Sequence, residues 1–163
     1  MNSSTNSSLT GTLPIVVSIF IAMVLVVMKL PQSFEAWRPD WVGVVVIAWA
    51  IFVPRVCGPV FGMLAGLAVD VLMGESLGVY ALIYAMLAYM ANVINFKMKM
   101  FKLFQQALVV FGLTLMARFL LVFLVEVNTE IFTDWLYWAP LIVNMIIWPW
   151  VYLVICNSMY AVT

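Results

Sequence analysis

The longest apolar stretches of this chain match the thickness of a lipid bilayer, and this feature constrains its fold more than any other. Residues 103–125 form an apolar run interrupted by a single charged residue, Arg118. A helix needs about 20 apolar residues to cross the hydrocarbon core. Of all 163 residues, 67% are hydrophobic and 9% are charged, whereas soluble domains contain about 25% charged residues. The sequence therefore predicts an all-α, polytopic membrane protein.

Six apolar segments predict a single bundle of six transmembrane helices within residues 13–156. The predicted spans are 13–30, 41–53, 56–73, 77–96, 103–125 and 136–155. Pro54 separates the second span from the third, because proline breaks a helix. The segment 41–53 is short for a bilayer, so five crossings are the alternative. Residues 1–12 are polar and predicted to be disordered, and residues 157–163 form a short C-terminal tail.

The basic residues of the short loops predict the orientation, because cytoplasmic loops carry an excess of Lys and Arg. With six spans and a cytoplasmic N-terminus, the cytoplasmic loops contain four basic residues and the outer loops two (Arg55, Lys97, Lys99 and Lys102 against Lys29 and Arg38). Both termini are therefore predicted to be cytoplasmic.

The residue inventory argues against catalysis and cofactor binding. The chain has no histidine and zero net charge, which removes the usual general base and any basic surface for nucleic acid. Cys57 and Cys156 show no metal-ligand or redox spacing and are expected to be free thiols. No phosphate-binding loop or nucleophile motif occurs in the sequence. We therefore predict a protein that is not an enzyme, with no catalytic residue, cofactor or metal.

The most regular pattern is a series of glycines at four-residue spacing in the third span. Gly58, Gly62 and Gly66 form two overlapping GxxxG units, and such small residues let helix backbones approach closely in a membrane. The favoured interpretation is packing within this chain, with the short helix 41–53 expected to fill the groove. The alternative is a docking face for the helix of a partner protein.

Two charged residues, Asp70 and Arg118, lie within predicted spans. On the six-span interpretation their depths differ by about 6 Å, so we predict a buried ion pair. A structural role is favoured over substrate binding or proton transfer, since a proton relay usually needs several acidic groups. The intramembrane amides, including Gln106 and Asn144, are expected to form interhelical hydrogen bonds.

Several motifs, taken in order, resemble the MreD family of rod shape-determining membrane proteins. Arg38-Pro39-Asp40-Trp41 opens a short apolar span, and the glycine series with Asp70 and Gly74 follows. Gln105-Gln106-Ala107 and Trp148-Pro149-Trp150 are similar to later segments of that family. The resemblance covers roughly residues 38–152. Arg118 has no counterpart in it.

The resemblance implies a scaffold of the bacterial cell-elongation machinery that binds MreC and supports peptidoglycan synthesis. The wider complex would include MreB, RodA and a class B penicillin-binding protein. The implied fold is similar to the substrate-binding subunits of energy-coupling-factor transporters. A solute-binding subunit of a vitamin-type transporter is therefore the alternative function, although few convergent polar groups are evident in the sequence.

Overall fold

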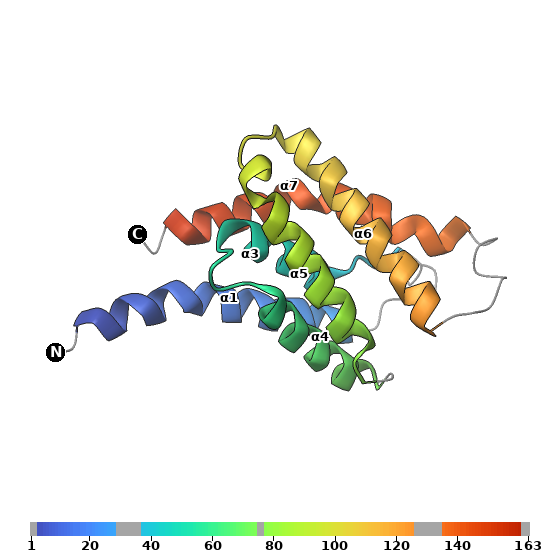
Figure 1. Cartoon of the computed structure of the whole chain (residues 1–163), viewed down its shortest axis with the longest axis horizontal. Coiled ribbons are helices and arrows are strands. Elements are labelled where there is room, and N and C mark those ends of the chain that lie inside the picture. The colour runs from blue at the N-terminus through green and yellow to red at the C-terminus, as the bar shows by residue number, and fades with distance from the viewer. Residues whose placement is uncertain (1–2, 29–36, 75–76, 126–134, 161–163) are drawn as a thin grey trace.

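The computed structural model describes residues 3–28, 37–74, 77–125 and 135–160. These residues form six α-helices and one short 3-10 helix, η2 (Figure 1), with no strand among them. The helices are α1 (Ser3–Val27), α3 (Trp41–Phe52), α4 (Pro59–Met73), α5 (Val79–Met98), α6 (Leu103–Val125) and α7 (Ala139–Tyr160), with η2 (Trp135–Trp138) directly before α7. The predicted all-helical fold is confirmed.

Three of these segments are long and apolar enough to cross a membrane. They are Val79–Met98, Leu103–Val125 and Leu136–Ser158. Three further apolar helices in the described chain are shorter, namely Thr12–Val27, Trp41–Phe52 and Pro59–Met73. The structure therefore agrees with a polytopic membrane protein, while the number of crossings stays a prediction.

Two predicted boundaries differ from the structure. Helix α1 begins at Ser3, within the segment for which we predicted disorder. Adding a residue to an existing helix costs far less than starting one, so the apolar part of α1 can extend into polar sequence. Helix α7 likewise continues to Tyr160, into the predicted C-terminal tail.

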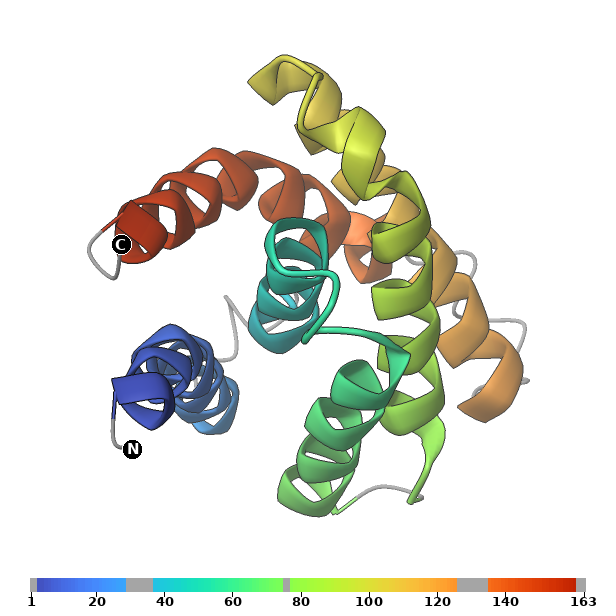
Figure 2. The ribbon, with the colours of Figure 1, turned by 60° about the vertical axis from the view of Figure 1, so that its left-hand side comes forward.

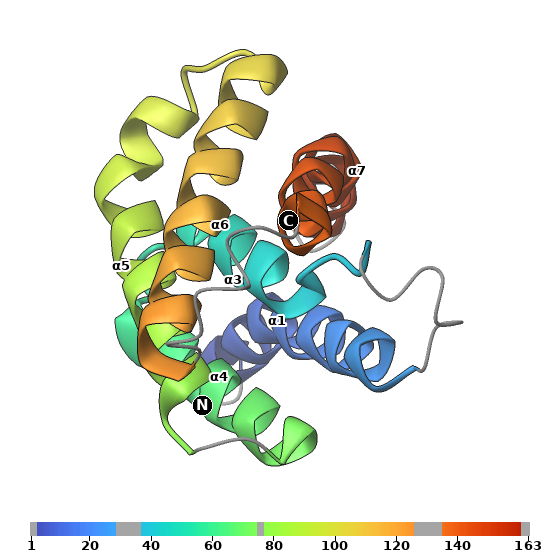
Figure 3. The same cartoon turned by 90° about the vertical axis from the view of Figure 1, so that its right-hand side faces the viewer.

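Helix α3 is the centre of the bundle. Nine of its 12 residues are buried, and Figures 2 and 3 show α5 and α6 on one side of it with α1 and α7 on the other. Asp40 caps its first turn, where the Gly43 N–H donates to the carboxylate at 3.0 Å. The helix stops at Phe52, two residues before Pro54. Its 12 residues span about 18 Å, against about 30 Å for the hydrocarbon core.

Helices α4 and α5 form the most extensive contact of the bundle. Proline is the first residue of α4, and the helix ends at Gly74, whose positive φ of 67° is the left-handed conformation that terminates many helices. A second left-handed glycine, Gly78 with φ 106°, precedes α5. The two glycines reverse the chain, so that α5 runs back along α4.

The chain order gives the bundle two distinct ends. The end of α4 and the starts of α3, α5 and α7 lie together at one end, around a shared cavity; we call this the cavity end. The turn after α3, which carries Arg55, and the last turn of α5, which contains Lys97, belong to the opposite end. Both termini also lie on one side of the molecule (Figure 1), as an even number of alternating crossings would require.

Candidate functional site: a polar cavity at one end of the bundle

The glycine series on α4 is covered by α5 of the same chain. A Cβ atom at Gly62 would overlap the carbonyl oxygen of Tyr84, and one at Gly66 would overlap that of Tyr80. Gly58 differs, because its Cβ would meet only the Asn92 amide nitrogen at 3.7 Å. The prediction of close internal packing agrees with this geometry at Gly62 and Gly66. The expected neighbour was wrong, because α5 rather than α3 fills the groove.

Asp70 is fully buried and forms hydrogen bonds to the first turn of α5. Its carboxylate accepts from the backbone N–H groups of Gly78 at 2.8 Å, Tyr80 at 2.9 Å and Ala81 at 3.3 Å. The first N–H groups of a helix have no partner within that helix, and the positive end of the helix dipole favours an anion there. Asp70 is therefore a capping group that α4 supplies to α5.

The predicted ion pair between Asp70 and Arg118 is not formed. The Asp70 oxygens are occupied by backbone N–H groups, while the guanidinium of Arg118 lies over the ring of Tyr137, with Cζ 5.0 Å from the ring centroid. Equal depth along two helices was a poor guide here, because it says nothing about which faces of those helices meet. We therefore discard this pairing.

Asp40, from the motif Arg38-Pro39-Asp40-Trp41, joins three helices. Its carboxylate Oδ1 accepts a 2.6 Å hydrogen bond from the Tyr84 hydroxyl of α5, in addition to capping α3. Its backbone N–H donates to Oδ1 of Asn144 in α7 at 3.1 Å. The predicted interhelical role of Asn144 agrees with this contact. Asp40 therefore ties the start of α3 to both neighbours.

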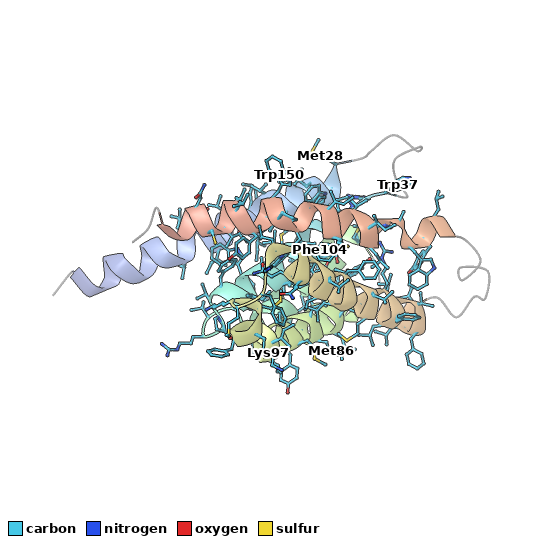
Figure 4. All side chains as sticks on the ribbon, turned by 90° about the horizontal axis from the view of Figure 1, so that it is seen from above. Met28, Trp37, Met86, Lys97, Phe104 and Trp150 are labelled. Carbon is cyan, nitrogen blue, oxygen red and sulfur yellow. The ribbon has the colours of Figure 1, made fainter. Side chains whose placement is uncertain are left out.

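A second polar network lies toward the opposite end of the bundle. The buried amide of Gln106 donates to the carbonyl oxygens of Met98 and Phe101 and accepts from the indole N–H of Trp148 at 3.4 Å. Trp148 is fully buried, whereas Trp150 is 72% exposed on the surface of α7 (Figure 4). Proline 149 lies inside α7. The motif Trp148-Pro149-Trp150 thus contributes one residue to the core and one to the surface.

The polar groups around Asp40 line a cavity of about 410 Å³. Five α-helices, η2 and the residues 38–40 contribute to it. Its polar side chains come from segments far apart in sequence (Arg38, Asp40, Tyr80, Tyr84, Thr114, Arg118, Tyr137 and Asn144). Small-molecule sites have volumes of about 300–1,000 Å³, so the cavity is large enough for a small ligand group.

Sequence reasoning identified only part of this cavity. Arg38, Asp40 and Arg118 were singled out, but in separate arguments, and Tyr84 was missed because a tyrosine in an apolar span carries no signal of its own. The signal that could have found it is indirect: Asp40 opens a buried helix, and a carboxylate that is partly withdrawn from water needs hydrogen-bond donors. No group of three or more residues able to hold a metal ion occurs in the described chain.

These features together define a class: a helical membrane protein with a small polar cavity at one end and a capping carboxylate buried between two helices. Residues 7–157 match the family of rod shape-determining protein MreD. Because this match covers most of the chain, the chain belongs to the MreD family. Family membership gives it a role in the determination of rod shape, and the family is known for this structural role rather than for catalysis.

A relative supports the assignment. The chain is 29% identical over 136 residues to the rod shape-determining protein MreD of Haemophilus influenzae (strain ATCC 51907 / DSM 11121 / KW20 / Rd), covering 82% of each chain. No solved structure matches the fold. The predicted likeness to energy-coupling-factor transporter subunits therefore stays a prediction.

Proposed function

We propose that this protein is a non-enzymatic scaffold of the cell-elongation machinery in the bacterial cytoplasmic membrane. In this role it binds MreC directly and supports peptidoglycan synthesis, within a wider complex of MreB, RodA and a class B penicillin-binding protein. The observation that carries the proposal is membership of the MreD family, whose name describes a shape-determining role. This membership favours the scaffold over a vitamin-transporter subunit.

A surface groove between α1 and α7 is our proposed seat for the transmembrane helix of MreC. The groove has a volume of about 400 Å³ and is lined almost entirely by apolar side chains, including Ile21, Leu25, Trp150 and Val154. Helix association in a membrane depends on close packing, because lipid is as apolar as the side chains. We do not assign the seat to the glycine face of α4, because α5 packs directly on Gly62 and Gly66.

Co-purification with tagged MreC in mild detergent tests this proposal. We expect Trp150→Ala to reduce the recovered MreC severalfold, because a large side chain at the groove is removed. Phe123→Ala is the matched control: Phe123 is 81% exposed on α6 and does not line the groove. Equal recovery of MreC with wild type, Trp150→Ala and Phe123→Ala would place the contact elsewhere. No recovery of MreC with the wild type would overturn direct binding.

A further inference from the structure

The cavity holds two arginines and one aspartate, and the aspartate is already engaged. Its Oδ1 accepts from the Tyr84 hydroxyl and the Gly43 N–H, and it lies at the N-terminus of α3, where the helix dipole offsets negative charge. Arg38 donates to the carbonyl oxygen of Leu25 at 3.5 Å and has no carboxylate partner among the described residues. The described residues that line the cavity therefore carry one more positive than negative charge.

Of the charged groups in the cavity, Arg118 has the most to gain from a bound anion. It lies seven residues before the last residue of α6, about 10 Å along a helix long enough to cross the membrane. Among the described residues it forms no ion pair or hydrogen bond, and its contact is with the Tyr137 ring. A cation within a membrane span is costly unless it is paired or reaches water. An anion in the cavity would remove this cost.

The remaining lining suggests what kind of anion fits. Guanidinium groups bind phosphate and carboxylate through two parallel hydrogen bonds. The amide of Asn144 adds a hydrogen-bonding group, while Val69, Met73 and Leu121 make other parts of the wall apolar. A charged head beside an apolar wall suits an amphiphilic molecule better than a fully hydrated ion.

We propose that this cavity is a binding site for a phosphate-type oxyanion, held by Arg118 and Arg38. The same chemistry is offered by the headgroup of an anionic phospholipid and by a small soluble phosphate. This inference is independent of MreC binding, because its test uses the protein alone.

Native mass spectrometry of the purified full-length chain tests the lipid source. The protein is mixed with equal amounts of phosphatidylglycerol and phosphatidylcholine, and the retained lipid is counted. We expect wild type to retain phosphatidylglycerol preferentially and Arg118→Gln to retain about tenfold less, the loss expected for a charge-assisted pair of hydrogen bonds. Arg55→Gln is the control, since Arg55 is exposed on the α3–α4 turn outside the cavity.

Thermal unfolding in detergent with added glycerol phosphate or inorganic phosphate tests the soluble source. A rise in the melting temperature of wild type that Arg118→Gln lacks would identify a soluble phosphate. If Arg118→Gln does not fold, Leu121→Trp replaces it, because it fills part of the cavity and keeps both arginines. Loss of retention in Leu121→Trp supports a site inside the cavity. The proposal is overturned if neither probe distinguishes the cavity variants from wild type, or if Arg55→Gln loses as much lipid as Arg118→Gln.

Discussion

Gly62 and Gly66 lie where the backbone of α5 passes closest to α4. A methyl group at Gly62 would collide with the Tyr84 carbonyl and would approach the Ala88 Cβ to 2.9 Å. Backbone atoms cannot move aside as the end of a flexible side chain can. The space around Gly58 is larger, with one side-chain atom at 3.7 Å. The three glycines therefore look alike in the sequence and differ in the structure.

We expect Gly62→Ala to destabilise the protein by about 1–3 kcal/mol, the usual cost of overpacking a core. Gly58→Ala should be close to neutral. Each variant is expressed without partner proteins, and its unfolding in detergent is monitored by circular dichroism to compare the free energies of unfolding. Equal stability of Gly62→Ala and wild type would mean that α4 and α5 are farther apart than described here.

Asp70 is the second residue whose substitution is informative. Asp70→Asn removes the negative charge and replaces one accepting oxygen with an amide that meets an N–H donor of α5. We expect a loss of about 2 kcal/mol, the scale of a lost helix cap with a buried unsatisfied group. Because Asp70 and Arg118 do not touch, the effects of Asp70→Asn and Arg118→Gln should add within about 0.5 kcal/mol. A larger coupling energy in this double-mutant cycle would show that the Asp70 and Arg118 side chains interact after all.

At the scale of the element, the hydrogen bonds at the start of α3 fix its position, because the helix does not have the length that would fix it across a bilayer. At about 18 Å it is shorter than the hydrocarbon core, and it is surrounded by other helices, so its position depends on the contacts of Asp40 with Tyr84 and Asn144. Tyr84 is fully buried, and its hydroxyl bonds Asp40 at 2.6 Å.

Tyr84→Phe keeps the ring and removes only this hydrogen bond. We expect it to lower stability by about 1–2 kcal/mol, since a hydrogen bond to a charged group is lost and the partly buried carboxylate of Asp40 is left with fewer donors. Tyr89→Phe on the same helix is the control, because Tyr89 is 56% exposed and should tolerate the change. Hydrogen exchange at the first turn of α3 should also increase in Tyr84→Phe alone. Unchanged exchange there would show that Asp40 does not need this donor.

The helices themselves were largely predictable from the sequence, whereas the pairs of helices that pack against each other were not. The apolar length of α6, the break at Pro54 and the glycine spacing of α4 all act through local sequence, so they could be recognised in advance. Which helix lies against Gly62 depends on the turn between α4 and α5, where two glycines adopt positive φ. The cavity was also beyond prediction, because Arg38, Tyr84 and Asn144 come together only when three helices pack.

At the scale of the whole molecule, the basic residues and the helix directions indicate the same orientation. Arg55 and Lys97 belong to the end of the bundle opposite the cavity. Because cytoplasmic loops carry an excess of Lys and Arg, that end is predicted to face the cytoplasm. The cavity would then face the outside, where the acidic segment 126–134 also lies on the six-span interpretation.

Reporter fusions test this orientation directly. Fusions at Thr163 and between Lys97 and Lys102 should report the cytoplasm, and fusions within 126–134 should report the outside. The physical reason is that basic loops resist translocation. If the fusion at Thr163 reports the outside, the number of crossings is odd and the 41–53 and 56–73 segments do not form two separate spans.

The position of Asp40 also has a consequence for synthesis of the chain on the ribosome. Its partners Tyr84 and Asn144 follow it by 44 and 104 positions, so α3 is made long before the groups that hold it. Until then, the nascent chain carries an apolar helix too short for lipid and without its anchors. We expect this helix to need shelter from lipid until the start of α7 emerges. Chains that stall after α6 should therefore be unstable and degraded, which makes completion of the bundle a late, nearly all-or-none event.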